Sequence, residues 1–167
     1  FMPKQYISSV KFYPDIDNVN IGMEIETCGS CDLEITVNFD GREMAHTVLK
    51  STCGRNNVSL HLNEKHLWEI GKGNLYDVKF KFGEDEVDSY FGLRQVYMDG
   101  LKFMLNHNSV FQRLVLDQGF YPDGIYTAPS EEALIRDIDL SLACGFDGAR
   151  LHQKVFEERF LYHCDKK

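Results

Sequence analysis

The chain has 167 residues, 43% of them hydrophobic and 13% aromatic, which is enough apolar material for one good core and part of a second. Lysine and arginine together number 18 against 26 acidic residues, a net charge of −8. This balance offers no basic face for a phosphate backbone and argues against nucleic-acid binding. No apolar run reaches the roughly 18 residues of a membrane-spanning helix, so no membrane segment is predicted.

Alternating apolar and polar residues predict antiparallel strands in the first half. Apolar residues occupy every second position in residues 19–25 and 33–39, which gives each strand one buried and one solvated face. Asp40-Gly41 then provides a hairpin turn, because positive φ is cheap for glycine and tolerable for aspartate, so residues 42–50 are the predicted partner strand. Further strands are predicted near residues 7–13, 58–62, 76–82 and 87–93. Short strands at this spacing are typical of a sandwich of immunoglobulin type.

The five cysteines are an odd number without framework spacing, which favours a reducing compartment such as the cytoplasm. Cys28-Gly29-Ser30-Cys31 has the spacing of half a zinc site or of a redox pair. No second ligand pair follows at a matching distance, so we interpret the segment as a turn and expect no metal and no cofactor. A small cysteine-based metal or redox protein is an alternative that rests on Cys28 and Cys31 alone.

Trp68 precedes the glycine-rich corner Gly71-Lys72-Gly73. An aromatic face suits the apolar side of a pyranose, so Trp68 is a candidate sugar platform. Large aromatic side chains are more often buried, and we favour packing at a corner of the sandwich.

The second half changes to a strand, helix, strand, helix order. An apolar strand at residues 114–116 ends in Asp117 and Gln118, a helix is predicted for residues 130–144, and a strand at residues 148–151 ends in His152. Polar groups that follow successive strands separated by a helix are the pattern of a (β/α) barrel. An aromatic helix is predicted for residues 155–164, packed outside the second strand.

The first of these helices has clear boundaries. Ser130 is a natural N-cap, Glu131 and Glu132 suit the positive end of the helix dipole, and Gly145 ends the helix. Asp137 lies beside the apolar face and is interpreted as a solvated or locally paired carboxylate. The apolar face consists of Leu134, Ile135, Ile138 and Leu142.

Several motifs occur together in a specific order. They are Trp68, Leu75-Tyr76, Ser89-Tyr90-Phe91-Gly92-Leu93-Arg94, Phe103-Met104-Leu105-Asn106, Leu116-Asp117-Gln118-Gly119, Tyr126-Thr127-Ala128-Pro129-Ser130, Asp137-Ile138, Gly145-Phe146, Arg150 and His152-Gln153-Lys154-Val155. The series resembles the junction between sandwich and barrel in glycoside hydrolase family 2, the β-galactosidase and β-glucuronidase family.

The resemblance implies a mainly β chain with two domains. Residues 1–97 are expected to form an immunoglobulin-like β-sandwich, and residues 98–167 the first two β/α units of a truncated (β/α)8 TIM barrel. The polar turn at residues 106–109 would close a hairpin under the barrel; the family usually has glycine where His107 stands.

The resemblance also implies the chemistry. The parent enzyme would hydrolyse O-glycosidic bonds of β-galactoside-like or β-glucuronide-like substrates with retention, using two glutamates. In the family these glutamates follow the fourth and seventh barrel strands, so no catalytic residue is expected in this chain, which would be an inactive piece of a larger enzyme.

The expected substrate-binding residues are Asp117, Gln118, Arg150 and His152. The commoner family pattern has two residues between the arginine and the histidine, whereas one separates Arg150 from His152. The alternative is that Arg150 and His152 only bridge neighbouring loops.

The expected partner of the parent is a carbohydrate, with no nucleic acid and no membrane, and self-association is expected for the chain by itself. A stand-alone carbohydrate-binding or scaffolding sandwich is the alternative function.

Overall fold

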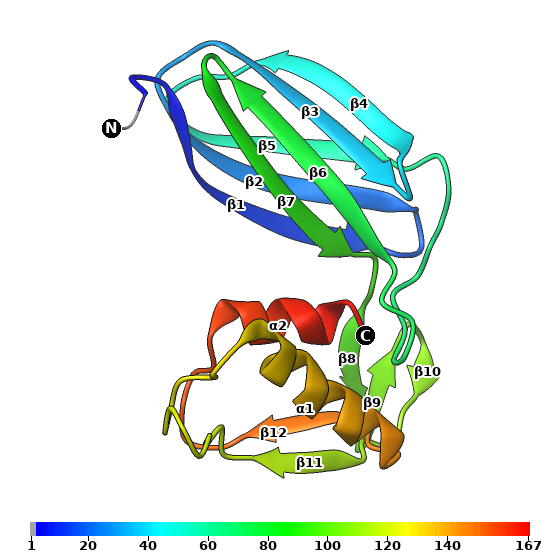
Figure 1. Ribbon diagram of the computed structural model, residues 1–167. Helices are drawn as coiled ribbons and strands as arrows, with labels where there is room; N and C mark the ends of the chain where they lie inside the picture. The colour runs from blue at the N-terminus through cyan, green and yellow to red at the C-terminus, as the bar shows by residue number, and fades with distance from the viewer. Residues whose placement is uncertain (1–2) are drawn as a thin grey trace. The chain divides into compact units, whose positions relative to one another are not determined.

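A computed structural model describes residues 3–167 (Figure 1). The chain folds as two compact units. The first comprises the residues up to Trp68 together with Asn74–Gln95, and the second comprises Glu69–Gly73 and Val96–Lys167.

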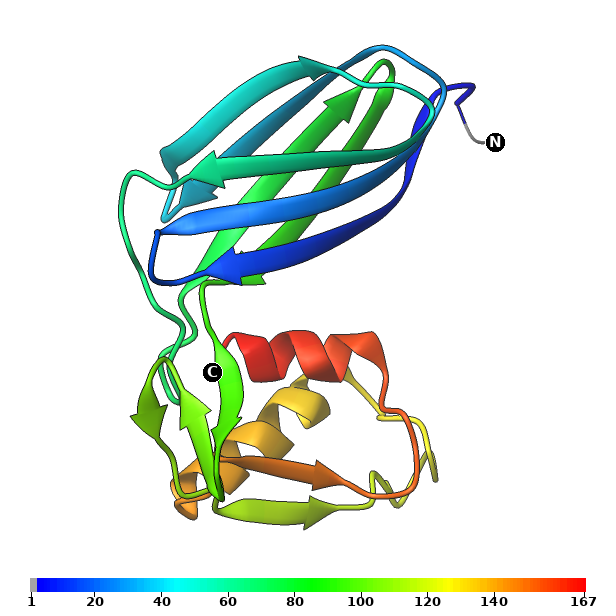
Figure 2. The ribbon, with the colours of Figure 1, turned by 180° about the vertical axis from the view of Figure 1, so that it is seen from behind.

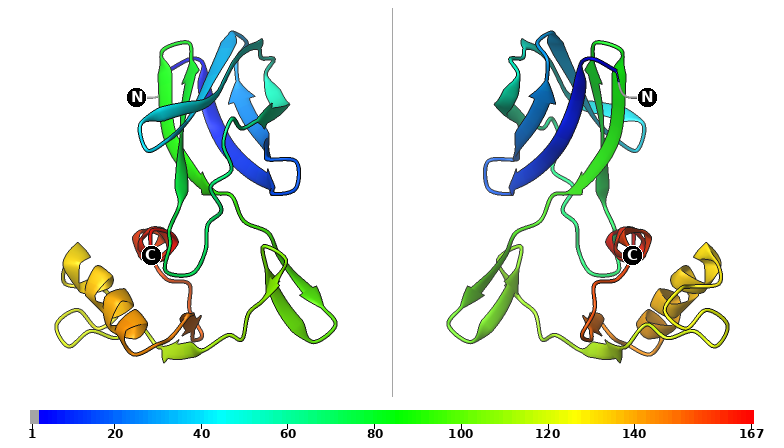
Figure 3. Two further views of the ribbon diagram at one scale, coloured as in Figure 1. Left: turned by 90° about the vertical axis from the view of Figure 1, so that its right-hand side faces the viewer. Right: turned by 90° about the vertical axis from the view of Figure 1, so that its left-hand side faces the viewer.

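The first unit is a β-sandwich of two antiparallel sheets. The strands are β1 (Tyr6–Asp15), β2 (Asn20–Cys28), β3 (Asp32–Phe39), β4 (Arg42–Lys50), β5 (Gly54–His61), β6 (Leu75–Phe82) and β7 (Asp85–Gly92). One sheet has the strand order β1-β2-β5 and the other β4-β3-β6-β7 (Figures 2 and 3). Strand β4 therefore belongs to the larger sheet, next to β3, with which it forms a hairpin.

The seven strands predicted from alternation are all present, and the alternation has its expected cause. In β2, β3 and β6 every second side chain is buried, and these side chains meet in one core between the sheets. The predicted hairpin turn is also confirmed, since Asp40 and Gly41 have φ values of 51° and 74°. Side chains with no exposed surface include Ile21, Ile25, Leu33, Ile35, Tyr76 and Phe80.

The buried Tyr76 shows how the core accepts a polar group. Its hydroxyl donates to the carbonyl of Glu64 at 2.9 Å and accepts from the amide of His66 at 2.8 Å. Both hydrogen-bonding capacities of the hydroxyl are used, which offsets the cost of removing it from water.

Trp68 is packed within the first unit. Its amide donates to the carbonyl of Leu93, a Cβ on Gly92 would lie 3.2 Å from the Trp68 Cβ, and the Arg94 guanidinium lies 4.4 Å from the ring centroid. The half-buried ring is thus held by β7 and by a cation over its face. These contacts favour corner packing over an open sugar platform.

The second unit begins with the three-stranded sheet β10-β9-β8, formed by β8 (Val96–Asp99), β9 (Lys102–Leu105) and β10 (Asn108–Ser109). The turn between β9 and β10 places Asn106 at φ 50° and His107 at φ 65°. Both values lie in the left-handed region where glycine is favoured. His107 accepts this conformation and pairs through Nδ1 with the Tyr97 hydroxyl at 3.2 Å.

The rest of the second unit is a β-α-β-α arrangement. Strand β11 (Leu114–Asp117) pairs in parallel with β12 (Gly148–Leu151), and α1 (Glu131–Ala143) connects them, followed by α2 (Glu158–Asp165). This two-stranded sheet is open. The two helices form a small core with Leu151. The buried side chains of this core are Ala128, Leu134, Ile138 and Phe160.

The boundaries of α1 agree with the prediction. The Ser130 hydroxyl accepts from the amide of Ala133 at 3.3 Å, and Gly145 follows the helix at φ 84°. Helix α2 begins three residues later than predicted, at Glu158, because residues 152–157 form a loop instead. An acidic residue in the first turn of α2 suits the helix dipole.

Neither helix in residues 3–167 is long and apolar enough to cross a membrane. In the same described residues, no group of three or more histidine, cysteine, aspartate or glutamate side chains is arranged to hold a metal ion.

Candidate functional site

A pocket of about 580 Å³ lies in the second unit, where the chain leaves β11 and β12. One wall is the loop after β11, another is the loop after β12, and the first residues of the helices complete it. The lining residues are Gln118, Gly119, Phe120, Tyr121, Tyr126, Leu134, His152, Gln153, Lys154, Val155, Phe156, Glu157 and Phe160.

Asp117, the last residue of β11, holds the loop that follows it. Its Oδ1 accepts from the amide of Gly119 at 2.7 Å, and its backbone carbonyl accepts from the amide of His152 at 2.9 Å. Gly119 has φ 60° and is buried, so a side chain there would both strain the backbone and enter occupied space. Asp117 therefore fixes the first loop and joins it to the second.

The expected site residues are divided between the two faces of the small sheet. Leu116 and Arg150 are register partners with exposed side chains, whereas Asp117 is paired with Leu151, which packs on the helices. Because side chains alternate along a strand, Asp117 is directed to the helix side. Burial raises the pKa values of Tyr121 and Cys164, and the nearby charge of Asp117 adds to the shift of both.

Arg150 and His152 are brought together. Arg150 Nη1 donates to His152 Nδ1 at 2.5 Å. A guanidinium has only donors, so the Nδ1 atom must be the acceptor and the ring hydrogen lies on Nε2. His152 lines the pocket and is half-buried, which makes it a hydrogen-bond donor oriented by Arg150. Gln118 also lines the pocket and is exposed.

Lys154 also joins the two loops. Its Nζ donates to the carbonyl of Gly119 at 2.5 Å. The same ammonium lies 5.3 Å from the ring of Phe120, 4.7 Å from Tyr126 and 5.0 Å from Phe156. Aromatic faces attract a cation within about 6 Å, so the three rings form a cage around Lys154, which we call the lysine cage.

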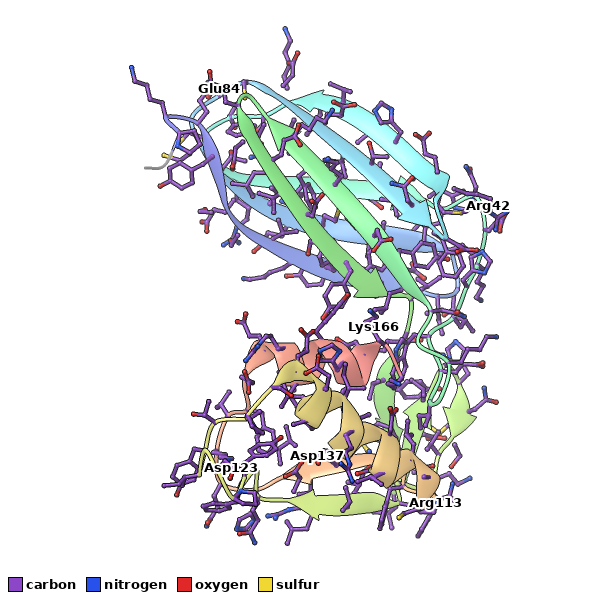
Figure 4. All side chains as sticks on the ribbon, in the orientation of Figure 1. Arg42, Glu84, Arg113, Asp123, Asp137 and Lys166 are labelled. Carbon is purple, nitrogen blue, oxygen red and sulfur yellow. The ribbon has the colours of Figure 1, made fainter. Side chains whose placement is uncertain are left out.

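Tyr121 links the pocket to α1. Burial and a hydrogen bond to Asp137 raise its pKa well above the usual tyrosine range. Asp137 projects from α1 (Figure 4) and is half-buried, so it is the locally paired carboxylate that the sequence allowed. The helices are joined by His163, whose Nε2 lies 2.9 Å from Glu131 Oε1.

Sequence reasoning missed the lysine cage and the pairing of Tyr121 with Asp137. Phe120, Tyr121 and Tyr126 form an aromatic cluster in the sequence that marks a structured loop. No local signal identifies Lys154, because its hydrogen-bond partner Gly119 lies 35 residues upstream, on the other loop.

The structure resembles solved glycosidase structures. A β-glucuronidase from Faecalibacterium prausnitzii superimposes with a TM-score of 0.86 at 23% identity, covering 98% of this chain and 27% of that one. A family 2 β-galacturonidase from Eisenbergiella tayi gives a TM-score of 0.80 at 19% identity, covering 98% and 31%. A β-D-glucuronidase from Dictyoglomus thermophilum gives 0.84 at 19%, covering 98% and 28%. The chain thus spans less than a third of these enzymes, and at such identities the likeness concerns the fold.

A comparison of the sequence with curated proteins found no match. The family model for the glycosyl hydrolases family 2 matches residues 5–94, which are the sandwich strands described above. The chain belongs to glycosyl hydrolase family 2.

Proposed function

We propose that this chain is part of a retaining β-glycosidase. The sandwich is the immunoglobulin-like domain, assigned to residues 1–97, and residues 98–167 provide the first two β/α units of a (β/α)8 barrel. The observation that carries the proposal is the parallel pair β11 and β12, connected through α1, with a pocket where both strands end. Barrel enzymes bind substrate at that end of their strands.

The parent would hydrolyse O-glycosidic bonds with two glutamates outside this chain, as the family places them. The chain by itself would be inactive. The similar structures are named as glucuronidases and a galacturonidase, so β-uronides are the first substrates to assay and β-galactosides the second.

The proposed contribution of this chain is to bind the sugar. Gln118 and His152 line the pocket, where an amide and an imidazole N–H suit adjacent hydroxyl groups. Arg150 orients His152 through their hydrogen bond. Asp117 is not among the residues that line the pocket, and its Oδ1 accepts from Gly119, so its proposed contact with the sugar is through Oδ2 at the end of β11.

The stand-alone binding module is less well supported. Its candidate platform was Trp68, and the Arg94 guanidinium covers that ring.

The test uses the full-length protein. Asp117→Ala should lower turnover at least tenfold, the equivalent of about 1.4 kcal/mol of transition-state stabilisation. Asp117→Asn keeps an oxygen for the Gly119 amide and removes only the charge, so it separates substrate contact from loop support. If Asp117 contacts the sugar, both variants are impaired; near-normal kinetics for Asp117→Ala would remove this residue from the site. Asp99→Ala, at the exposed end of β8 in the same unit, is the matched control.

A further inference from the structure

Three of the five cysteines occur at one end of the sandwich. Cys28 is the last residue of β2, and Cys53 immediately precedes β5. Within the β2–β5 ladder, Thr27 is the register partner of Gly54. The ladder ends at this pair, and Cys28 and Cys53 are the next residue of each segment beyond it. Directly opposite residues of antiparallel strands have Cβ atoms about 4.5–5.5 Å apart, and the two cysteines flank such a pair.

The Cys28 side chain belongs to the outer face of the three-stranded sheet. Thr27 is buried at 3% exposure and turned to the core, so its neighbour Cys28 is turned outward. Tyr6 is the register partner of Cys28 on the other side. A hydrogen bond between the Tyr6 hydroxyl and Cys28 raises the pKa of Tyr6, and the nearby charges of Cys28 and Cys53 raise it further. The Tyr6 hydroxyl therefore lies near both cysteine thiols.

Cys31 is directed elsewhere, although it forms the C-x-x-C spacing with Cys28. It packs against the sandwich core, and burial raises the pKa of its thiol, with a smaller contribution from Asp32. A Cβ on Gly83, in the turn before β7, would lie 3.6 Å from the Cys31 sulfur. Cys31 thus packs on the core, whereas Cys28 is not among the residues that do.

The segment that carries Cys53 is anchored to the strands that carry Cys28. The amide of Cys53 donates to the Ser30 hydroxyl at 3.3 Å, and the Thr27 hydroxyl donates to the carbonyl of Thr52 at 3.0 Å. Cys53 is exposed and Cys28 half-buried, so a small reagent reaches the pair through Cys53. These hydrogen bonds keep the Cys28 thiol near Cys53 while Cys53 reacts.

We propose that Cys28 and Cys53 form a modification site, a thiol pair that a low-molecular-weight disulfide such as glutathione disulfide converts to a cross-strand disulfide. The Cys53 thiolate attacks one sulfur of the reagent and releases one glutathione thiolate. The Cys28 thiolate then attacks the Cys53 sulfur and releases the second glutathione. Two electrons pass from the cysteines to the reagent, and the two cysteine protons end on the two glutathione thiols.

The test is disulfide mapping of the reduced, folded 167-residue chain after exposure to glutathione disulfide. Trypsin cleaves after Lys11, Arg42, Lys50 and Arg55, so residues 12–42 and 51–55 form separate peptides. The expected product joins these two peptides with the loss of two hydrogen atoms, and dithiothreitol reverses it. Because Cys28 and Cys31 share one peptide, the variant Cys31→Ser assigns the link: it should retain the cross-linked product in full.

The controls use single substitutions. Cys28→Ser and Cys53→Ser should each abolish the link, whereas Cys144→Ser, an exposed thiol of the other unit, should leave it unchanged. Unfolding in urea should spread the linkage over other cysteine pairs. Wild-type chain that accumulates glutathione on Cys53 while Cys28 stays reduced, or that links Cys28 to Cys31, would overturn the proposal.

Discussion

Replacing Lys154 by methionine removes the ammonium group and keeps an unbranched side chain of similar length. The hydrogen bond to Gly119 and the attraction to the rings of Phe120, Tyr126 and Phe156 are lost. Phe120 and Tyr126 are 58% and 66% exposed, so each ring contact contributes near the lower limit of about 0.5 kcal/mol. The hydrogen bond from a charged donor contributes about 1.5 kcal/mol.

These contributions total about 3 kcal/mol, and the methionine sulfur regains about 1 kcal/mol against the rings. The net loss of about 2 kcal/mol falls on the contact between the two pocket loops. Since about 1.4 kcal/mol is a factor of ten, local opening should become roughly 30-fold more frequent.

The assay is amide hydrogen exchange measured by mass spectrometry on peptides that cover residues 114–129 and 148–157. Exchange there should accelerate roughly 30-fold in Lys154→Met, whereas the fluorescence of Trp68, the single tryptophan, should show an unchanged first unit. Lys102→Met removes an exposed lysine of the same unit and is the control. An acceleration of less than about threefold, or an equal effect in the control, would refute the lysine cage as the contact that holds the loops.

Two further outcomes follow from burial in the second unit. Burial raises the pKa of Cys164 to about 11 from the ordinary value of 9.0. At pH 8 the thiolate fraction of Cys164 should therefore be roughly a hundredfold below that of a thiol with the ordinary pKa. Because the thiolate is the reactive form, the rate of alkylation by iodoacetamide should be lower by the same factor. As the pH rises toward 11 the deficit should disappear, and equal rates for Cys164 in folded and urea-unfolded chain at pH 8 would contradict it. For the chain alone, self-association is expected, because Leu114, Leu116 and Phe111 are 42%, 53% and 85% exposed and the outer edges of β11 and β12 are unpaired within residues 3–167. Light scattering after size-exclusion chromatography measures it, and a monodisperse monomer would count against it.

The strands, the turn and the first helix were predictable from the sequence because their causes are local. Burial of one face imposes a period of two on a strand, positive φ selects Asp40 and Gly41 for a hairpin turn, and Ser130 satisfies an amide only a few residues away. Each of these signals is contained in a short window, so the pattern identifies the element without knowledge of what it packs against.

The late start of α2 was not predictable in the same way. The aromatic spacing of residues 155–164 fits a helix, yet Phe156 contributes its ring to the lysine cage and Val155 is 95% exposed on the pocket loop. A contact with the other loop therefore outweighs local helical spacing.

The sequence by itself determined which residues are buried and where polar groups follow the strands. Only the tertiary structure decided what those groups contact. Asp117 is turned to the helices while Arg150 is exposed, Lys154 lies near three aromatic rings, and Cys31 packs on the core. The physical reason is that the hydrophobic periodicity of a strand or helix shows only which of its faces is buried. Strand register and loop closure, in contrast, bring together residues that are far apart in the chain. Those long-range pairings leave no mark in a short window of sequence.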